Sequence, residues 1–337
     1  MKIQAYAAKK PHDKLEYFEY DLGNIKPDEI EIDIEYCGIC HSDLSMLDND
    51  WGLTEYPIVP GHEIIGKVSE IGSMVEHLKV GQHVGIGWRA RSCLVCDQCL
   101  SGNHHRCLRG EDVIVGRHGG YADKLRCQGI WAFTLPQNID VKSAGPLFCG
   151  GITVFNPIIL NNIKSTDHVA VVGIGGLGHL ALKFLDAWGC EVTAFSTNPD
   201  KEKETRHYGA DHFVNSKEAG ILESIANRFD MVLVTTNVDL DWDAYINTLK
   251  PGGKLHIVGA APSIHTSVFP LISGERSIGG SPIGSPATIK MMLDFCNRHN
   301  ITPVTEEFPL SSVNEALDHL RAGKARYRAV LKNDFAR

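Results

Sequence analysis

The stretch HVAVVGIGGLGHLALKFL at residues 168–185 decides the fold of the second half of the chain. A short apolar run with the character of a buried strand leads into the glycine-rich segment GIGGLG, and a helix pattern follows directly. The order strand, GxGxxG, helix is typical of dinucleotide binding, whereas the same glycines elsewhere would indicate only a turn. The first glycine makes the tight turn, the second lets a pyrophosphate approach, and the last lets the helix pack on the strand. The amino terminus of the helix then faces the phosphates. The predicted cofactor-binding residues of this loop are Gly173, Gly175, Gly176, Leu177 and Gly178.

Alternating strands and helices continue on both sides of this motif. Residues 191–195, 230–236 and 253–259 read as further buried strands, and Leu222, Ile225 and Ala226 recur at helical spacing before the second of these. The pattern predicts an α/β fold with a doubly wound parallel sheet.

The end of the second strand favours NADP over NAD. An NAD enzyme tends to place an acidic residue there to bind the ribose hydroxyls, and a carboxylate would repel a 2′-phosphate. Here the predicted cofactor-binding residues are Ser196, Thr197, Asn198 and Lys201. Neutral donors and a cation suit a phosphate. The alternative is that these are ordinary turn residues, and Asp200 argues against a phosphate.

The first half of the chain is rich in strands. Residues 29–36 alternate acidic and apolar side chains, and residues 61–87 hold short β-branched runs between glycines, which suggests a barrel of short strands. We see no helical period before residue 140. Residues 289–299 and 311–322 are predicted to be helical, and the chain ends in a strand at 327–331.

Four cysteines crowd into one loop of this half. Cys93, Cys96, Cys99 and Cys107 have the spacing of a closed tetrahedral zinc site with four thiolate ligands. Such a site leaves no position for a substrate, so its predicted role is structural. Free thiols are the alternative interpretation.

A second metal site is predicted from residues far apart in the sequence. Cys40, His62 and Cys149 supply two thiolates and one imidazole, which is a catalytic zinc set with one open position. Each residue taken alone has an ordinary interpretation as a buried cysteine or a core histidine.

Composition sets the broad class. The chain has 337 residues, of which 22% are charged and 43% hydrophobic, with a formal net charge of −8. That charge argues against nucleic acid or an anionic membrane as a partner. No apolar run has the length of a membrane span, and the first residues carry no apolar signal core, so we expect a cytoplasmic protein. Ten cysteines in a reducing compartment favour metal ligation over disulfides.

Taken together, these motifs resemble the zinc-dependent alcohol dehydrogenases of the medium-chain dehydrogenase/reductase superfamily along essentially the whole chain. The likeness is to the cinnamyl-alcohol-dehydrogenase-like branch, and within it to bacterial NADPH-dependent aldehyde reductases of broad specificity. The resemblance is carried by CGICHSD at 37–43, GHE at 61–63, the four-cysteine loop, CGGIT at 149–153, the GxGxxG loop and RYR at 326–328.

The resemblance implies a domain organisation. A GroES-like β-barrel catalytic domain would comprise residues 1–150 and 286–337, and a Rossmann NADP-binding domain would comprise residues 151–285. Two zinc ions per chain, NADP(H) and a homodimer are implied with it.

The resemblance also implies roles for single residues. Cys40, His62 and Cys149 would hold the catalytic zinc, and Glu63 would exchange with its water. Asp43 would bond the free nitrogen of His62, unless it is a surface turn residue. Ser42 would be the proton relay, and His41 would extend that relay or neutralise the pyrophosphate. Thr153 would lie beside the nicotinamide, and Arg328 would lie near the pyrophosphate or else on a strand surface. The residues that would line the substrate pocket, or else lie in the core, are Trp51, Leu53 and Trp88.

The predicted function is zinc-dependent, NADPH-linked reduction of aldehydes to primary alcohols, with the reverse alcohol oxidation and a broad substrate range. An NAD-linked alcohol or polyol dehydrogenase is the alternative within the same class. A non-catalytic cofactor-binding protein and a zinc-ribbon nucleic-acid module are the alternatives outside it. The full ligand set argues against the first of these, and the net charge argues against the second.

Overall fold

The computed structural model describes residues 2–335 and divides the chain into two compact units. The first unit ends at Ile152 and resumes at Ile283, and the second unit runs Thr153–Pro282. The predicted domain limits, 150/151 and 285/286, lie within three residues of these positions. Among the described residues, no helix is both long and apolar enough to cross a membrane.

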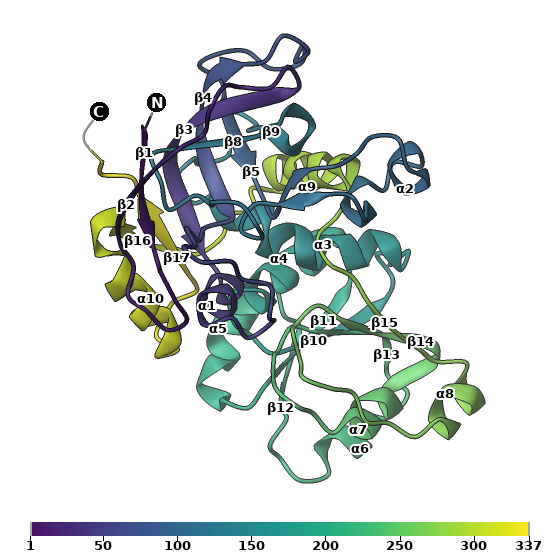
Figure 1. The fold of residues 1–337 in the computed structure, drawn as a ribbon. Helices are drawn as coiled ribbons and strands as arrows, with labels where there is room; N and C mark the ends of the chain where they lie inside the picture. The colour runs from purple at the N-terminus through teal and green to yellow at the C-terminus, as the bar shows by residue number, and fades with distance from the viewer. Residues whose placement is uncertain (1, 336–337) are drawn as a thin grey trace. The chain divides into compact units, whose positions relative to one another are not determined.

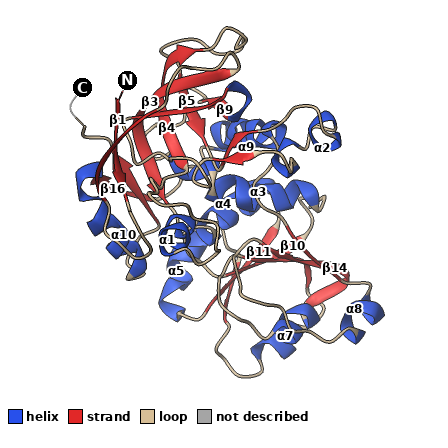
Figure 2. Ribbon diagram, viewed as in Figure 1, coloured by secondary structure: helices blue, strands red, loops and turns tan. Residues whose placement is uncertain are grey.

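The second unit contains a six-stranded sheet in which every neighbouring pair is parallel. The strands follow one another in the order β12-β11-β10-β13-β14-β15, so the chain starts in the middle and winds outward to both edges. Figure 2 shows helices on both faces of this sheet. The predicted doubly wound α/β arrangement is therefore confirmed. The strands are β10 His168–Val172, β11 Glu191–Ser196, β12 His212–Asn215, β13 Phe229–Val234, β14 Leu249–Ile257 and β15 Ser277–Gly280, and the helices are α4 Gly178–Trp188, α5 Glu202–His207, α6 Ile221–Ser224, α7 Trp242–Asn247 and α8 Phe269–Gly274.

Burial explains why these strands lack the alternation of a half-exposed sheet. All five residues of β10 are buried, as are the last four residues of β13. Parallel strands covered by helices on both faces read as continuous apolar runs, and this is the pattern at 168–172 and 231–234.

The first unit is built on a mixed seven-stranded sheet. Its order is β16-β17-β3-β4-β5-β9, and β8 also pairs with β3. The long strand β3 pairs with β17 near its carboxyl end and with β8 near its amino end, so the C-terminal segment returns to the N-terminal part of the chain (Figure 1). The strands of this unit are β1 Lys2–Ala7, β2 Glu16–Asp21, β3 Glu29–Ile39, β4 Glu63–Ile71, β5 His83–Ile86, β6 Arg89–Arg91, β7 Glu111–Asp112, β8 Lys124–Gln128, β9 Ala132–Thr134, β16 Thr305–Pro309 and β17 Arg328–Lys332, and the helices are α1 His41–Asp48, α2 Asp97–Leu100, α9 Pro286–His299 and α10 Val313–Arg321. One more helix, α3 Gly150–Leu160, begins in this unit and continues into the other.

One expectation for this unit is wrong. Helix α1 lies where no helical period was expected, and it buries Leu44, Met46 and Leu47. The helix is only eight residues long, about two turns, which is too short for a helical periodicity to stand out in the sequence. The predicted metal ligand Cys40 is the residue just before the helix, at its N-cap. Its peptide N–H donates to Asp43 Oδ2 at 2.9 Å, which satisfies one donor at the helix start.

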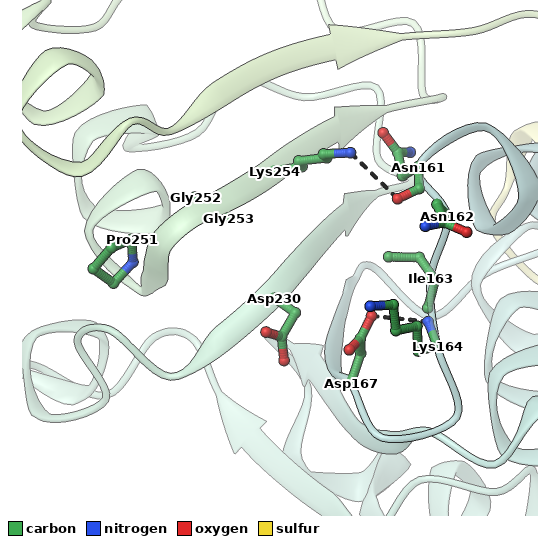
Figure 3. Close-up of a pocket in the computed structure, with 10 residues that line it drawn as sticks. All are labelled: Asn161, Asn162, Ile163, Lys164, Asp167, Asp230, Pro251, Gly252, Gly253 and Lys254. Atoms are coloured by element: carbon green, nitrogen blue, oxygen red, sulfur yellow. Dashed lines mark hydrogen bonds between the residues drawn. The ribbon is translucent and has the colours of Figure 1, made fainter.

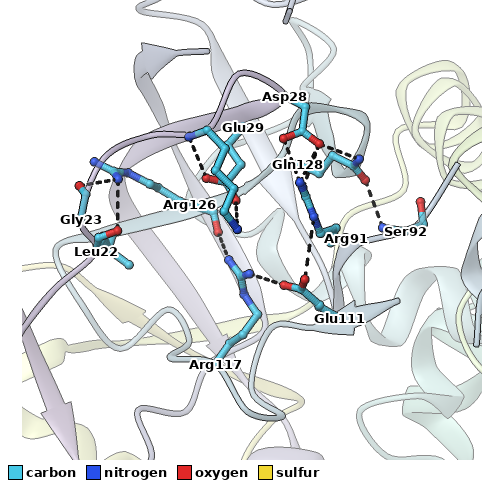
Figure 4. A network of polar contacts seen from close by, with 11 residues as sticks. Leu22, Gly23, Asp28, Glu29, Arg91, Ser92, Glu111, Arg117, Arg126 and Gln128 are labelled. Atoms are coloured by element: carbon cyan, nitrogen blue, oxygen red, sulfur yellow. Dashed lines mark hydrogen bonds and ion pairs between the residues drawn. The ribbon is translucent and has the colours of Figure 1, made fainter. Parts of the chain in front are cut away.

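A polar network anchors the base of the four-cysteine loop (Figure 4). Arg91 donates to both oxygens of Asp28, with N···O distances of 2.7 to 2.9 Å, and also pairs with Glu111 on the far side of the loop. Gln128 donates to Asp28 at 3.1 Å and accepts the peptide N–H of Ser92 at 3.0 Å. Because Ser92 directly precedes Cys93, this network fixes where the loop leaves the sheet.

Candidate metal and cofactor sites

The structure brings the four cysteines of the loop into one cluster. Their sulfur atoms all lie within 4.8 Å of one another. Cys93 and Cys99 are separated by 3.9 Å between sulfurs, and so are Cys96 and Cys107. Zinc–sulfur bonds of about 2.3 Å in a tetrahedron separate two sulfurs by about 3.8 Å. The four thiols therefore fit a zinc ion that has no open position.

Donors around this cluster favour the thiolate form of Cys93. Peptide N–H groups of Val95 and Cys96 point at its sulfur and lower the pKa of Cys93 to about 6. Arg109 also donates to it, with Nη2 3.1 Å from the sulfur. Sequence reasoning missed Arg109, because nothing in the cysteine spacing marks a cation two residues beyond the last ligand.

The second predicted ligand set also converges. Cys40, His62, Glu63 and Cys149 present one ligand atom each, and these four atoms lie within 4.8 Å of one another. The sulfurs of Cys40 and Cys149 are 3.9 Å apart, and His62 Nε2 lies 3.2 Å from Cys149 Sγ. Cys40 precedes α1, His62 precedes β4 and Cys149 precedes α3, so three segment ends meet at this point. The donor set and its spacing fit a zinc ion.

Asp43 holds three parts of this cluster at once. Its Oδ1 accepts from the peptide N–H of Gly61 and lies within hydrogen-bond distance of His62 Nδ1, both at 2.9 Å, while Oδ2 accepts from the peptide N–H of Cys40. The side chain is fully buried. The predicted bond to His62 is present, and the alternative of a surface turn aspartate is wrong. The bond leaves His62 Nε2 facing the sulfurs.

Glu63 is buried beside the cluster and is paired with Arg328 through Oε1. Its other oxygen, Oε2, has no hydrogen-bond partner among the described residues. A Cβ at Gly38 would come within 2.0 Å of this oxygen, so the glycine makes the space that the carboxylate occupies. An orphaned carboxylate oxygen next to two sulfurs and an imidazole is consistent with a metal ligand.

Arg328 lies in the first unit, on β17, and is only 5% exposed. Besides Glu63, it donates to the carbonyl oxygen of Ile39 at 3.3 Å. The alternative that it is a surface strand residue is therefore wrong, while its predicted contact with a pyrophosphate stays a prediction. Sequence reasoning missed the pair with Glu63, which joins residues 265 positions apart.

Charge is unevenly distributed in this cluster. A hydrogen bond from the Cys149 thiol holds the pKa of Cys40 well below that of an ordinary thiol, with Arg328 acting in the same direction against the effect of burial. The pKa of Cys149 is correspondingly raised, by its bond to Cys40 and by burial. Burial alone would lower the pKa of His62, but the Asp43 carboxylate raises it well above its ordinary value. A cation at the centre would stabilise the thiolate form of both cysteines.

The predicted proton-relay and pocket residues lie around the same cluster. Ser42 Oγ is 3.7 Å from Cys40 Sγ, and His41 beside it is exposed. The Trp88 ring stands edge-on to the His62 ring with centroids 5.0 Å apart, and Trp51 packs edge-on against Trp88 at 6.2 Å. Trp51 is 39% exposed and Leu53 is 52% exposed, so neither is a core residue.

The glycine-rich loop of the second unit has the predicted shape. Gly173 has a φ of +91°, a conformation that favours glycine, and a Cβ at Gly178 would lie 2.0 Å from the Gly173 carbonyl oxygen. At Gly175 a Cβ would meet nothing within 4 Å, so the space above this peptide is open. Thr235, which sequence reasoning missed, steadies the loop by donating to the Gly173 carbonyl at 2.6 Å.

The residues predicted to select NADP gather at the end of β11. Ser196 is the last residue of the strand, and its Oγ accepts the peptide N–H of Asn198 at 3.1 Å. Lys201 Nζ donates to the carbonyl oxygen of Ile174, so its ammonium group lies over the glycine-rich loop. Thr197 follows Ser196 and is exposed, while Thr153 lies on α3.

Two cavities lie away from all of these residues. One, of about 230 Å³, is bordered by Lys164, Asp167, Asp230 and Lys254 near the amino ends of β10 and β14 (Figure 3). The other, of about 320 Å³, lies in the first unit between Tyr20, Arg117 and Arg126. Neither contains a predicted ligand, so neither bears on the two metal clusters.

Comparison with known proteins places these features in a family. Residues 26–137 match the alcohol dehydrogenase GroES-like domain, and residues 176–298 match the zinc-binding dehydrogenase domain. The chain is 50% identical to aldehyde reductase AdhA of Synechocystis sp. over 332 residues, which cover 98% of this chain and 99% of that protein. It resembles the structure of cinnamyl alcohol dehydrogenase SbCAD4 from Sorghum bicolor with a TM-score of 0.94 and 31% identity, covering 98% of both chains. It also resembles a CAD from Helicobacter pylori complexed with NADP(H), with a TM-score of 0.91 and 28% identity, again covering 98% of both.

Proposed function

The chain belongs to the family of zinc-binding alcohol dehydrogenases, whose fold pairs a GroES-like domain with a Rossmann sheet, and we propose that it reduces aldehydes to primary alcohols with NADPH as the hydride donor. The observation that carries this proposal is the convergence of Cys40, His62, Glu63 and Cys149, of which the last three are buried and in which one carboxylate oxygen has no partner among the described residues.

Two zinc ions per chain are proposed, one in each cluster. In the four-cysteine loop all ligand positions belong to the protein, so the role is structural. At the buried cluster, Cys40, Cys149 and His62 would hold the metal, and Glu63 would be able to replace one of its other ligands. Zinc there would supply a Lewis acid that polarises a carbonyl oxygen and stabilises negative charge on it.

The side chains of this protein would perform the remaining tasks. Asp43 holds His62 in the orientation that directs Nε2 at the sulfurs. Ser42, which contacts Cys40, would pass the proton that the carbonyl oxygen gains when the carbon accepts hydride. His41 is exposed beside it and would connect this hydroxyl to solvent. Arg328 neutralises the buried Glu63 carboxylate, so that the cluster does not carry an uncompensated anion.

The cofactor would bind at the glycine-rich loop, with Thr153 beside the nicotinamide. Preference for NADPH is proposed because Ser196 occupies the strand end where NAD enzymes place an acid, and because Lys201 brings a cation over the loop. The relative from Helicobacter pylori with NADP(H) bound supports this choice. The aromatic pair Trp51 and Trp88 beside His62 would form one wall for apolar or aromatic aldehydes.

A homodimer in the cytoplasm is the proposed state of the protein. A reducing compartment keeps cysteines available as metal ligands. Light scattering on the purified protein would test the dimer.

Initial rates of NADPH and NADH oxidation with a panel of aliphatic and aromatic aldehydes, and of NADP and NAD reduction with alcohols and mannitol, test the function. We expect reduction of many aldehydes with a higher kcat/KM for NADPH. Preference for NADH with a polyol would instead support the alternative dehydrogenase, and no turnover on zinc-replete protein would refute the enzyme assignment.

A single substitution tests the cofactor argument separately. Ser196→Asp places a carboxylate at the strand end and is expected to lower kcat/KM for NADPH while leaving that for NADH nearly unchanged. Ser224→Asp, which adds the same charge to the exposed α6, is the matched control and should change neither. Equal effects of Ser196→Asp on both cofactors would contradict the assignment.

A further inference from the structure

Three side chains with metal-binding chemistry meet at the opposite end of the parallel sheet from the glycine-rich loop. His168, Glu191 and His212 are the first residues of β10, β11 and β12, which are neighbours in the sheet (Figure 1). We refer to these three residues as the amino-end cluster. None of them is among the predicted metal ligands or cofactor-binding residues.

The strand register places all three side chains on one face. His168 is the Cα partner of Glu191, and His212 is the partner of Thr193, which lies two residues after Glu191 on the same strand. Because side chains alternate with a period of two along a strand, Glu191 and Thr193 point the same way. Their partners His168 and His212 therefore point that way as well, so the strand pairing itself brings the three side chains of the amino-end cluster together.

The separations suit ligands of one ion. His212 Nε2 lies 2.7 Å and His168 Nδ1 lies 3.7 Å from Glu191 Oε1, and one ligand atom from each residue falls within 4.8 Å of the others. Nitrogen and oxygen ligands about 2.0–2.1 Å from a tetrahedral zinc ion lie about 3.4 Å apart. The two measured separations bracket this value.

The surroundings orient the buried histidine. His168 is only 6% exposed, and its Nε2 lies 2.8 Å from Thr193 Oγ1, so that nitrogen is engaged and Nδ1 faces Glu191. Binding of the second ring nitrogen by a neighbouring group is the usual arrangement for a histidine that ligates a metal. The side chains of Glu191 and His212 are about half exposed, at 51% and 42%, so an ion has access from solvent.

We propose that His168, Glu191 and His212 bind a divalent transition-metal ion of the zinc class, separate from the two cysteine-containing clusters. Two imidazoles and one carboxylate suit zinc, cobalt and nickel, and water would complete the coordination. The ion would join β12, the edge strand, to β11 and β10, so its effect is on the stability of the sheet.

A nearby cation competes with the ion. Arg228 Nη2 lies 3.8 Å from Glu191 Oε1. In a simple ion-pair cluster this arginine would stabilise the Glu191 carboxylate. At a metal site it would instead repel the bound metal ion, because both carry positive charge. Removing the arginine would therefore weaken a simple ion-pair cluster but strengthen the binding of a metal ion.

Cobalt titration of the zinc-replete holoenzyme tests the proposal. Cobalt that replaces zinc in a cysteine-containing cluster produces a thiolate charge-transfer band in the near ultraviolet, whereas cobalt held by histidine and carboxylate does not. We expect one cobalt ion per chain to bind, counted by elemental analysis after equilibrium dialysis, without that band. We also expect Tm to rise by a few degrees at a hundredfold excess of free cobalt over Kd.

Four variants complete the test. Glu191→Gln and His212→Asn, at half-exposed positions, are expected to lose this ion or to bind it at least about tenfold more weakly. Arg228→Gln is expected to bind it roughly two- to fivefold more tightly. His265→Asn, an exposed histidine of the same unit that bonds Ser263, is the control and should bind as the wild type does. The proposal is overturned if the wild type binds no cobalt without the thiolate band, or if all four variants bind it equally.

Discussion

Replacing Asp43 by asparagine removes the charge that organises the buried ligand cluster while keeping the shape of the side chain. The two carboxylate oxygens accept three hydrogen bonds, all of 2.9 Å, from the peptide N–H groups of Cys40 and Gly61 and from His62 Nδ1. An asparagine amide keeps one oxygen and turns the other into a donor. Whichever way the amide is oriented, at least one buried N–H then faces an NH₂ group and loses its partner.

The cost follows from these contacts. A hydrogen bond to a charged group contributes about 1.5–3 kcal/mol, and a buried donor left unpaired costs about 1–3 kcal/mol. With one bond lost and two weakened, we expect the free energy of unfolding to fall by about 2–4 kcal/mol. Because His62 also loses the carboxylate that orients it, we expect metal affinity at the buried cluster to fall by about 10- to 100-fold.

Zinc competition measures this loss directly. Wild type and Asp43→Asn would be equilibrated with a series of chelator concentrations, and zinc per chain would be counted by elemental analysis. We expect only one of the two release steps to shift, because Asp43 does not contact the four-cysteine loop. Urea unfolding of the zinc-loaded proteins supplies the change in stability.

Asp48→Asn on the same helix is the matched control. Asp48 also accepts from more than one donor, with Arg321 and His12 as its partners, but it lies outside the ligand cluster. Its replacement is expected to lower stability and leave both zinc-release steps unchanged. Unchanged release from Asp43→Asn, or an equal shift from both variants, would refute the role of Asp43 in orienting His62.

Three further outcomes follow from the structure. Cys99→Ala is expected to remove one zinc ion and to lower Tm while the folded fraction still reduces aldehydes, which metal analysis, calorimetry and initial rates would show. Loss of catalysis with an unchanged Tm would mean that the roles of the two zinc sites are exchanged. Gly178→Ala forces a Cβ to within 2.0 Å of a backbone oxygen, so we expect weaker nucleotide binding by calorimetry together with lower stability, and wild-type values for both would contradict the close packing. Burial lowers the pKa of His256 to about 4 from an unfolded value of 6.5, so the folded state resists protonation and stability is lost as pH falls from 6.5 towards 4, by at most about 3 kcal/mol. Urea unfolding across this range should show a shallower pH dependence in His256→Gln, and an equal slope in both proteins would rule out this histidine as its source.

The Rossmann sheet was predictable because its local signals agree. The strand at 168–172 has the predicted limits, and β11 extends only one residue past the predicted 191–195. The central strands β10 and β13 are buried almost throughout, so their sequences are nearly continuous apolar runs. The glycine-rich loop carries its signal in the spacing of its glycines, which its close packing requires. The cysteine loop was predictable for a similar reason, since all four thiols lie within 15 residues of one another.

The parts that failed depend on contacts across the chain. Helix α1 was missed because its eight residues combine metal-cluster side chains with a short buried face, and no periodicity emerges from so few turns. The pair between Glu63 and Arg328 was missed because strand order in the sheet brings β17 beside β3, and no local pattern encodes that pairing. The motif RYR at 326–328 by itself does not indicate which residue Arg328 contacts.

The position of Arg328 near the C-terminus has a consequence for how the protein is made. During synthesis Cys40, Glu63 and Cys149 all emerge well before residue 328, so a nascent chain has every ligand but not the counter-ion of Glu63. Burying that carboxylate alone is costly, so we expect the cluster to close only when β17 has been released and paired with β3. A chain that lacks this strand is therefore expected to keep the Glu63 side chain in contact with water and to bind zinc at this cluster more weakly than a chain that includes it, which zinc competition on the two proteins would measure.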